Sequence, residues 1–262
     1  MVPGQHDEFL AFAHELADLA RRITLHYFRH PLGIKHKADN TPVTVADRTT
    51  EQLLRDKIDE HYPQHGIIGE EQGSKASQGA YEWIVDPIDG TKNFISGYPL
   101  YGTLICLLEN GQPIVSLIDI PAQDERFFAT VDMPTYYRKG KEERVVGTAQ
   151  RYDLSEALLF STDYTMFQAR EHRQVKTLRE SVGMVRYNGD CYLYAMLACG
   201  WIDLVLEADL KIYDFLPLML IVTQAGGVIS DWQGRPLTKQ SSGQVLASAN
   251  NTLHAAALAK IH

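Results

Sequence analysis

The sequence has few cysteines, and their arrangement does not suggest a covalent or metal-bound framework. Three cysteines occur among 262 residues, an odd number with no C-x-x-C spacing. A disulfide scaffold or a structural zinc site is therefore not expected, and a reducing cytoplasm is the expected location. The polar and acidic first eight residues are likewise not expected to form a secretory signal peptide.

Long apolar runs and an excess of basic residues are also missing. The longest apolar run, residues 216–222, is too short to span a bilayer. Lysine and arginine number 25 against 33 aspartates and glutamates, which gives a formal net charge of −8. Because nucleic acids and anionic membranes attract basic surfaces, neither is an expected partner. The ten histidines show no spacing typical of metal ligands.

A G-x-G-x-x-G motif after an early strand is absent, which disfavours a doubly wound nucleotide-binding fold. The chain instead mixes helices, hairpins and buried strands, a pattern typical of an α+β layered fold. In the first half, apolar periodicity predicts a helix at residues 8–28, a polar loop at 35–47 and a second helix ending near Tyr62. Strands are predicted at residues 65–69, 82–85, 100–108, 113–120 and 125–131, with Asn110-Gly111 as a hairpin turn.

A basic, irregular segment at residues 134–147 is predicted to separate two halves of a single unit, about residues 1–135 and 150–262. In the second half, apolar patterns predict strands at residues 158–162, 184–188, 202–207 and 245–248. Helices are predicted at 167–182, 191–199, 213–225 and the end of the chain, with Gly226-Gly227 closing the third. Residues 73–79 are small and polar and are predicted to form a mobile loop.

The stretch Trp83-Ile84-Val85-Asp86-Pro87-Ile88-Asp89-Gly90-Thr91 contains the most informative chemistry. A strand is predicted to deliver Asp86 at its end, because Pro87 lacks a ladder N–H group. Gly90-Thr91 are predicted to open a short helix, whose free N–H groups favour an anion. Two carboxylates this close repel each other unless a cation lies between them, and such ligands suit Mg²⁺ shared with phosphate. On spacing alone, a plain strand-to-helix turn explains D-P-x-D-G equally well.

The longer string Asp86-Pro87-Ile88-Asp89-Gly90-Thr91, with Asn93-Phe94 behind it, resembles the signature of the inositol monophosphatase superfamily. Three further segments resemble that superfamily in the right order: Thr44-Val45-Ala46-Asp47, Gly69-Glu70-Glu71, and Asp214 followed by Ala225-Gly226-Gly227. Tyr213 and Gln224 depart from a pattern that usually has Trp and Glu. Singly, Asp47 could be a first-turn charge, Glu70 part of a solvated loop and Asp214 an N-cap.

The resemblance implies a layered αβαβα sandwich, a Mg²⁺-dependent phosphomonoesterase and commonly a homodimer. Gly90 and Thr91 would bind the phosphate of a small substrate. Thr91, with Asp47 and Glu70, would position and activate the attacking water. The ligands of two or three Mg²⁺ ions per site would be Glu70, Asp86, Asp89, Asp214 and the carbonyl of Ile88.

The second half is similar to the histidinol-phosphatase branch of the superfamily, on the segments Asn188-Gly189-Asp190-Cys191-Tyr192 and Tyr213-Asp214-Phe215-Leu216. Histidinol phosphate carries an ammonium group and an imidazole, and Asp190 and Glu207 are predicted to bind such a cation. Two structural alternatives stay open, since Asp190 could cap the following helix and Glu207 could pair with Lys211. The predicted substrate-binding residues are Asp89, Gly90, Thr91, Asn188, Gly189, Asp190, Glu207 and Asp214.

The sequence thus predicts hydrolysis of L-histidinol phosphate to L-histidinol and phosphate, a step of histidine biosynthesis. An inositol monophosphatase-like enzyme of broader specificity is the alternative within the superfamily. A non-catalytic regulator that kept the fold and binds metal is a remote alternative. It is disfavoured because every implied metal ligand and Thr91 are present.

Overall fold

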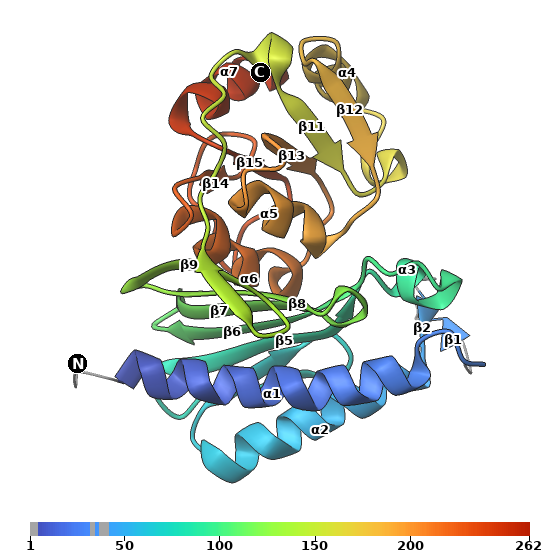
Figure 1. Cartoon of the computed structure of the whole chain (residues 1–262), viewed down its shortest axis with the longest axis vertical. Coiled ribbons are helices and arrows are strands. Elements are labelled where there is room, and N and C mark those ends of the chain that lie inside the picture. The colour runs from blue at the N-terminus through green and yellow to red at the C-terminus, as the bar shows by residue number, and fades with distance from the viewer. Residues whose placement is uncertain (1–4, 32–34, 37–41) are drawn as a thin grey trace.

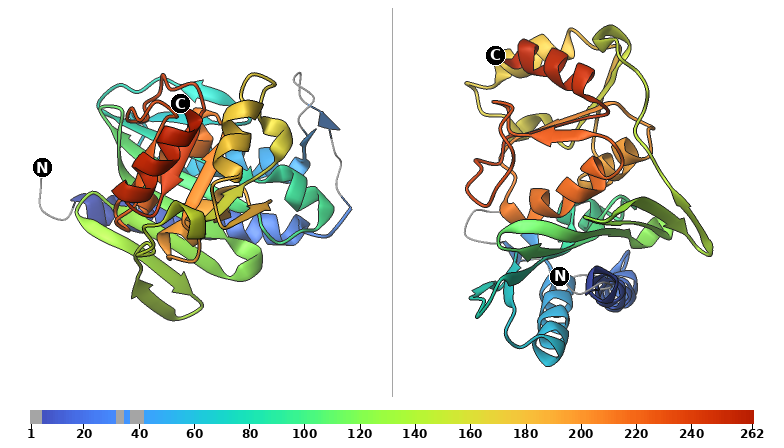
Figure 2. Two further views of the ribbon diagram at one scale, coloured as in Figure 1. Left: turned by 90° about the horizontal axis from the view of Figure 1, so that it is seen from above. Right: turned by 90° about the vertical axis from the view of Figure 1, so that its left-hand side faces the viewer.

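The computed structural model describes residues 5–31, 35–36 and 42–262. Residues 1–4, 32–34 and 37–41 lie outside the described residues, and with them the first residues of the chain and the middle of the predicted polar loop. Helices and two sheets alternate in five layers, as Figures 1 and 2 show from three directions. This αβαβα arrangement confirms the predicted fold class. No helix in the described ranges is long and apolar enough to cross a membrane.

The first two layers are a pair of helices and an eight-stranded sheet. Helices α1 (Gln5–Tyr27) and α2 (Val45–His61) pack against one face of the sheet, whose strand order is β10-β9-β8-β7-β6-β5-β3-β4. Its strands are β3 (Gly66–Gly69), β4 (Gly73–Lys75), β5 (Tyr81–Asp89), β6 (Gly102–Glu109), β7 (Gln112–Ile120), β8 (Glu125–Thr130), β9 (Met133–Lys139) and β10 (Glu142–Val145). A separate two-stranded ladder joins β1 (Lys35–His36) and β2 (Pro42–Val43).

The alternating side chains of this sheet explain why it is covered on both faces. Trp83 and Val85 of β5 pack in one apolar cluster with α1 and α2. Ile84, between them, packs in a second cluster with the helices on the opposite face. Because successive strand residues point to opposite faces, strands that are apolar at every position must be buried on both.

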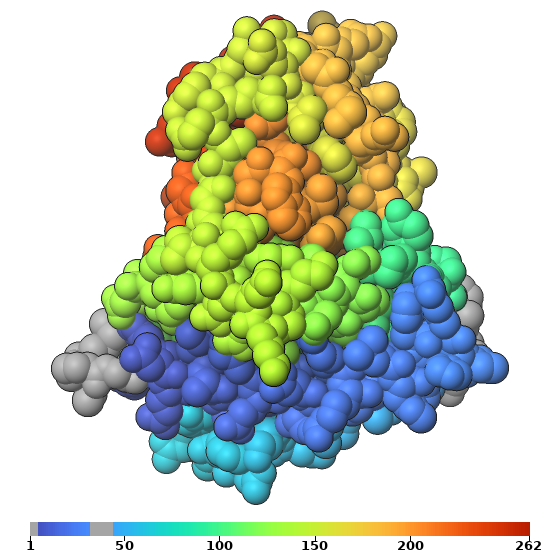
Figure 3. Space-filling view, viewed as in Figure 1, coloured from blue at the N-terminus to red at the C-terminus, as the bar shows by residue number. Residues whose placement is uncertain are grey.

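The remaining layers come from the second half of the chain. Helices α5 (Cys191–Ala198) and α6 (Ile212–Thr223) lie between the large sheet and a five-stranded sheet of order β12-β11-β13-β15-β14. Helices α4 (His172–Arg179) and α7 (Asn251–Ile261) cover the outer face of the smaller sheet. Its strands are β11 (Leu158–Ser161), β12 (Met184–Tyr187), β13 (Leu204–Glu207), β14 (Val228–Ser230) and β15 (Val245–Ser248). In Figure 3 the orange elements of the second half lie directly on the green strands.

Strand β5 is longer than predicted and bends around the central motif. It continues past Pro87 to Asp89, with a register shift against β6 between Asp86 and Asp89. Pro87 cannot donate to the ladder, but its carbonyl accepts a hydrogen bond from Thr103 Oγ1 at 2.9 Å. The bulge therefore replaces the predicted strand end, and it directs two aspartates to one end of the sheet.

Three other segments correct the sequence-based predictions. Residues 73–75, predicted as part of a mobile loop, form β4, which pairs with β3. The segment 134–147, predicted to be irregular, contains the β9–β10 hairpin, whose outer strand is exposed and charged, as edge strands often are. The charged helix predicted at 167–182 is shorter, and a 3₁₀ turn over Tyr164–Met166 precedes it. The division into two halves stays a prediction.

Candidate functional site

The centre of the site is a group of carboxylates delivered by three different elements. Asp86 and Asp89 lie on either side of the β5 bulge, and Asp214 lies in the first turn of α6. One oxygen from each of these three side chains lies within 4.8 Å of the other two. Glu70, which follows β3, adds a fourth negative charge beside Asp86. The structure thus brings together all four predicted carboxylate ligands.

Burial makes this cluster costly without a cation. The pKa of Asp86 lies well above its usual value, mainly because the side chain is buried and then because of the charges of Glu70, Asp89 and Asp214. Burial and the charge of Asp89 likewise raise the pKa of Asp214. The backbone N–H of Lys211 donates to Asp214 Oδ2 at 2.7 Å and acts in the opposite direction, lowering this pKa. No ion pair joins Asp86, Asp89 or Asp214 to a basic side chain in the described part of the chain.

Asp214 and Asp47 both occupy the third position of a helix and complete a capping box. The alternative that Asp214 is an N-cap residue is therefore wrong, because Lys211 occupies the N-cap and Asp214 lies three residues later. Asp47 accepts from Thr44 N–H at 2.8 Å through Oδ2, which is its structural role. Its other oxygen faces Thr91, whose Oγ1 lies 3.4 Å from Asp47 Oδ1 and 3.1 Å from the Ile88 carbonyl. Asp47 thus combines a helix-capping contact with one to the predicted water-positioning residue.

The predicted phosphate segment begins the short helix α3 (Thr91–Ser96). Gly90 has φ 82°, a left-handed conformation that glycine adopts at little cost. An added Cβ on Gly90 would stand 3.0 Å from Asp190 Oδ2, so the backbone there lies against the second half of the chain. Asp89 also contacts the second half of the chain, because its Oδ2 accepts a hydrogen bond from the Cys191 N–H at 2.6 Å.

The predicted cation-binding residues lie at this junction. Asp190 precedes α5 but makes no side-chain cap bond, and Asp89 caps that helix instead, so the capping alternative fails for the Asp190 side chain. Burial raises its pKa well above the usual value, and the charges of Asp89 and Glu207 add to this effect. Its amide N–H donates to Thr162 Oγ1 at 3.0 Å.

Glu207 is 2% exposed at the end of β13. It accepts from Thr162 N–H at 3.0 Å and from Tyr194 OH at 2.8 Å, while burial raises its pKa to about 7. The predicted alternative pairing with Lys211 is wrong, because Lys211 bonds to Asp209 at 2.7 Å.

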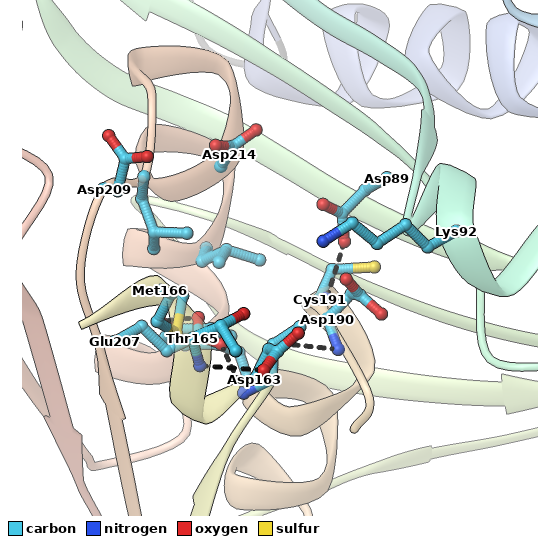
Figure 4. A pocket seen from close by; sticks show the side chains of 14 residues that line it. Asp89, Lys92, Asp163, Thr165, Met166, Asp190, Cys191, Glu207, Asp209 and Asp214 are labelled. Carbon is cyan, nitrogen blue, oxygen red and sulfur yellow. Dashed lines mark hydrogen bonds between the residues drawn. The ribbon is translucent and has the colours of Figure 1, made fainter. Parts of the chain in front are cut away.

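Two adjoining cavities, about 380 and 620 Å³ in volume, surround these residues. The larger is lined by Glu70, Gly90, Thr91, Asn188 and Asp190, and the smaller by Asp89, Asp190, Glu207 and Asp214, together with further residues. Gly189, also predicted to bind substrate, is buried and is flanked in the chain by the cavity-lining residues Asn188 and Asp190. Side chains from several segments converge on the smaller cavity in Figure 4.

Sequence reasoning missed three residues that line both cavities: Lys92, Thr162 and Asp163. Lys92 is the only basic residue among the described residues lining the smaller cavity, which contains six carboxylates (Asp89, Asp163, Asp190, Glu207, Asp209 and Asp214). Asp163 could have been found from the sequence, because it directly follows the strand predicted at residues 158–162. Residues at strand ends often line binding sites in layered α/β structures. A cavity of this charge favours a ligand that carries positive groups.

Comparison with known proteins agrees with this geometry. A family model described as the inositol monophosphatase family matches residues 5–262. A histidinol-phosphatase of Chlorobaculum parvum is 35% identical over 245 residues, which cover 93% of each chain. The chloroplastic bifunctional phosphatase IMPL2 of Arabidopsis thaliana is 39% identical over 251 residues, 95% of this chain and 71% of that protein. The solved structure of an inositol monophosphatase from Zymomonas mobilis has a TM-score of 0.88 at 39% identity, covering 98% of each chain. The chain therefore belongs to the inositol monophosphatase family.

Proposed function

We propose that the protein is a Mg²⁺-dependent phosphomonoesterase that hydrolyses L-histidinol phosphate to L-histidinol and phosphate. The observation that carries the chemistry is the cluster of buried Asp86 with half-buried Asp89 and Asp214, none of which forms an ion pair with a basic side chain among the described residues. Burying several negative charges together is costly unless a cation completes the site. The substrate rests on the acidic cavity beside the cluster and on the similarity to proteins named histidinol-phosphatase.

The donor set fits Mg²⁺, which prefers hard carboxylate and carbonyl oxygens and shares its shell with substrate phosphate. When bound, Mg²⁺ neutralises phosphate oxygens and lowers the pKa of a coordinated water. The family commonly uses two or three ions, and the same number is proposed here. The residues that would hold them are Glu70, Asp86, Asp89, Asp214 and the carbonyl of Ile88.

The side chains around Thr91 supply the path for the proton of the attacking water. Thr91 Oγ1 lies within 3.4 Å of Asp47 Oδ1, so the hydroxyl can accept a proton from water while it passes its own to the carboxylate. We assign Glu70, beside Asp86, to orientation of the same water. As the water oxygen bonds to phosphorus, the bond from phosphorus to the alcohol oxygen breaks, and that oxygen takes a proton from solvent.

An inositol monophosphatase-like enzyme of broader specificity is the second candidate. It is favoured by the likeness to the Zymomonas mobilis structure at a TM-score of 0.88. Inositol is neutral, however, whereas the four carboxylates of the smaller cavity that are not proposed metal ligands, Asp163, Asp190, Glu207 and Asp209, favour an alcohol portion that carries positive charge. The homodimer also belongs to the proposal, and size-exclusion chromatography with light scattering tests it.

The deciding experiment measures phosphate release with Mg²⁺ on histidinol phosphate and inositol 1-phosphate at matched concentrations. We expect kcat/KM for histidinol phosphate to be higher by roughly a hundredfold, about 2.7 kcal/mol in transition-state binding. A preference for inositol 1-phosphate would overturn the proposed substrate and leave the broader enzyme. No turnover of any phosphomonoester, with Mg²⁺ bound, would instead support a non-catalytic regulator.

A further inference from the structure

The turn that carries Glu70 has little packing of its own to fix its position. Glu70, Glu71 and Gln72 connect β3 to the edge strand β4, and the glycines on either side of the turn pair with each other across the ladder. Gln72 and Gly73 are exposed, and a Cβ on Gly73 would meet nothing within 4 Å. A short polar turn at the edge of a sheet opens readily unless other contacts hold it. The position of Glu70 therefore requires support from another element.

A buried carboxylate on α2 supplies this support. Glu51 is 0% exposed, and it accepts the backbone N–H groups of Glu71 at 2.6 Å through Oε2 and of Gln72 at 3.0 Å through Oε1. Arg55, four residues further along α2, donates through Nε to Glu51 Oε1 at 2.8 Å and through Nη2 to the Gly73 carbonyl. Helix α2 thus holds three consecutive residues of the chain that follow the proposed metal ligand.

The contact between Glu51 and the chain beside the turn is close enough to require glycine at Gly69. A Cβ on Gly69 would stand 2.2 Å from Glu51 Oε1 and 2.5 Å from Glu51 Cδ, far inside van der Waals contact. The carboxylate therefore lies directly against the backbone that leads into Glu70. Because Glu51 is buried, bonded to two backbone N–H groups and paired with Arg55, it is fixed in this place.

The same face of α2 carries the carboxylate that contacts Thr91. Asp47 and Glu51 are four residues apart, so they lie on one side of the helix. Asp47 contacts Thr91, whereas Glu51 holds the turn that carries Glu70. Thr91 and Glu70 line the same cavity. One helix face therefore sets the relative position of the two groups proposed to act on the attacking water.

We propose that Glu51 is a positioning residue of this site, which acts through the backbone of the β3–β4 turn to hold Glu70 in place beside Asp86 and Thr91. The inference rests on the proposed function, in which Glu70 is a Mg²⁺ ligand and orients the attacking water. Glu51 lines neither of the two cavities, so it acts through Glu70 and does not touch the substrate. Residues that orient a metal ligand typically change metal affinity or activity by about 10- to 100-fold when they are replaced.

Glu51→Gln tests the inference, because glutamine keeps the size of the side chain but has a single oxygen. Its NH₂ group must face at least one of the two turn N–H groups, which then loses its acceptor. We expect Mg²⁺ binding, measured by calorimetry without substrate, to weaken by about 10- to 100-fold, and kcat to fall by at least about tenfold. KM for histidinol phosphate, or for inositol 1-phosphate if that ester is preferred, should stay within about twofold, because Gly90 and Thr91 still bind the phosphate.

Hydrogen exchange of the turn is a second measurement, and it does not depend on turnover. In the wild type the Gln72 amide should exchange slowly although the residue is exposed, because a buried carboxylate accepts its hydrogen. Glu51→Gln should speed this exchange while the amides of β5 stay protected. Fast exchange of both the Glu71 and the Gln72 amide in the wild type would overturn the inference, and this result needs no folded variant.

Glu171→Gln is the matched control. Glu171 is 4% exposed at the start of α4, where it accepts the Gln168 N–H at 2.8 Å and a hydrogen bond from the Gln244 side chain at 2.7 Å. The same substitution there should lower the free energy of unfolding, measured in urea, and leave Mg²⁺ affinity and kcat at their wild-type values. Lowered stability with wild-type Mg²⁺ affinity and kcat in Glu51→Gln would show that Glu51 is only structural and overturn the inference.

The same measurements separate this inference from the proposed function. If Glu51→Gln keeps wild-type Mg²⁺ affinity while the wild type hydrolyses histidinol phosphate, the inference fails and the function stands. If the wild type hydrolyses no phosphomonoester, the proposed function fails. Weaker Mg²⁺ binding and faster turn exchange in Glu51→Gln would then still support the positioning of Glu70 by Glu51.

Discussion

Asp119 and Asp86 are both buried on the large sheet, yet their surroundings are opposite. Asp119, on β7 and 0% exposed, accepts from Arg21 at 2.7 and 3.0 Å and from Arg126 at 2.7 Å. Asp86, on β5 and 1% exposed, has the carboxylates of Glu70, Asp89 and Asp214 as its charged neighbours. One aspartate is neutralised by the protein itself, and the other is surrounded by further negative charge.

The difference separates a structural from a functional buried charge. The two arginines come from α1 and β8, so Asp119 joins a helix to the sheet. Removing it would take away the one carboxylate that they share and leave Arg21 with Asp124 and Arg126 with Asp18. Among the described residues no basic side chain forms an ion pair with Asp86. Burying its charge therefore lowers the stability of the fold, and a bound cation would remove this loss. Perturbed carboxylates in a cavity are typical of functional sites, whereas paired ones are typical of structural networks.

The largest expected effect is the loss of catalysis in Asp89→Asn. The asparagine keeps an oxygen for the Cys191 N–H, which now lies 2.6 Å from Asp89 Oδ2, so the fold should be preserved. Loss of one proposed metal ligand should lower kcat/KM by at least about 10⁴-fold, or about 5.5 kcal/mol. Steady-state phosphate release checks the rate, and calorimetric titration with Mg²⁺ checks the binding. Near-wild-type rates would refute the metal assignment.

Asp119→Ala should show the reverse behaviour. The buried Arg126 and the half-buried Arg21 would lose their shared carboxylate but keep Asp18 and Asp124 as second partners, so the free energy of unfolding should fall by about 3 kcal/mol, the low end for a broken buried ion pair. Urea denaturation measures this loss, and Asp119→Asn, which keeps the shape, should lose less. Mg²⁺ affinity and kcat should stay close to wild type in whichever variant folds. A selective loss of Mg²⁺ binding with normal stability would show that the two regions are not separate.

The sequence was most predictive where function is concentrated in contiguous residues. Asp86, Asp89, Gly90 and Thr91 are close in the chain, so a strand end and a helix start place them together without long-range information. The mixture of helices and strands indicated only an α+β layered fold, and the five-layer αβαβα order came from the resemblance to the superfamily. The β9–β10 hairpin was missed since its outer strand is exposed at every position and charged at the first three, which leaves no apolar alternation to recognise.

Contacts between distant segments could not be predicted from spacing. Asn93 bonds to Asp190 across 97 residues, and Glu207 is held by Thr162 across 45. Local reasoning instead offered near neighbours, as in the alternative pairing of Glu207 with Lys211, although Glu207 is buried and Lys211 is exposed and bonds to Asp209. The roles of the site residues stay predictions, and the variants described here test them.

The smallest expected effect is a pH dependence of the stabilisation by Mg²⁺. Burial and neighbouring carboxylates raise the pKa of Asp86 and Asp214 in the metal-free protein above their unfolded values. Between those values the folded state binds more protons than the unfolded state, so the stability of metal-free protein falls as pH rises. Mg²⁺ needs the deprotonated carboxylates, so its stabilising effect should grow over the same range.

At pH 8, Mg²⁺ at a hundred times its dissociation constant should add about 2.7 kcal/mol to the free energy of unfolding. The same Mg²⁺ concentration should add progressively less toward pH 5, where protons compete for the cluster. Urea denaturation with Mg²⁺ and with a chelator, across this pH range, measures the difference. In Asp89→Asn the gain should be small at every pH, whereas Asp119→Asn should keep the wild-type pH dependence from a lower baseline. A gain that is equal at pH 5 and pH 8 would mean that Mg²⁺ binds elsewhere, because only a site built from buried, protonated carboxylates must release protons as the cation enters.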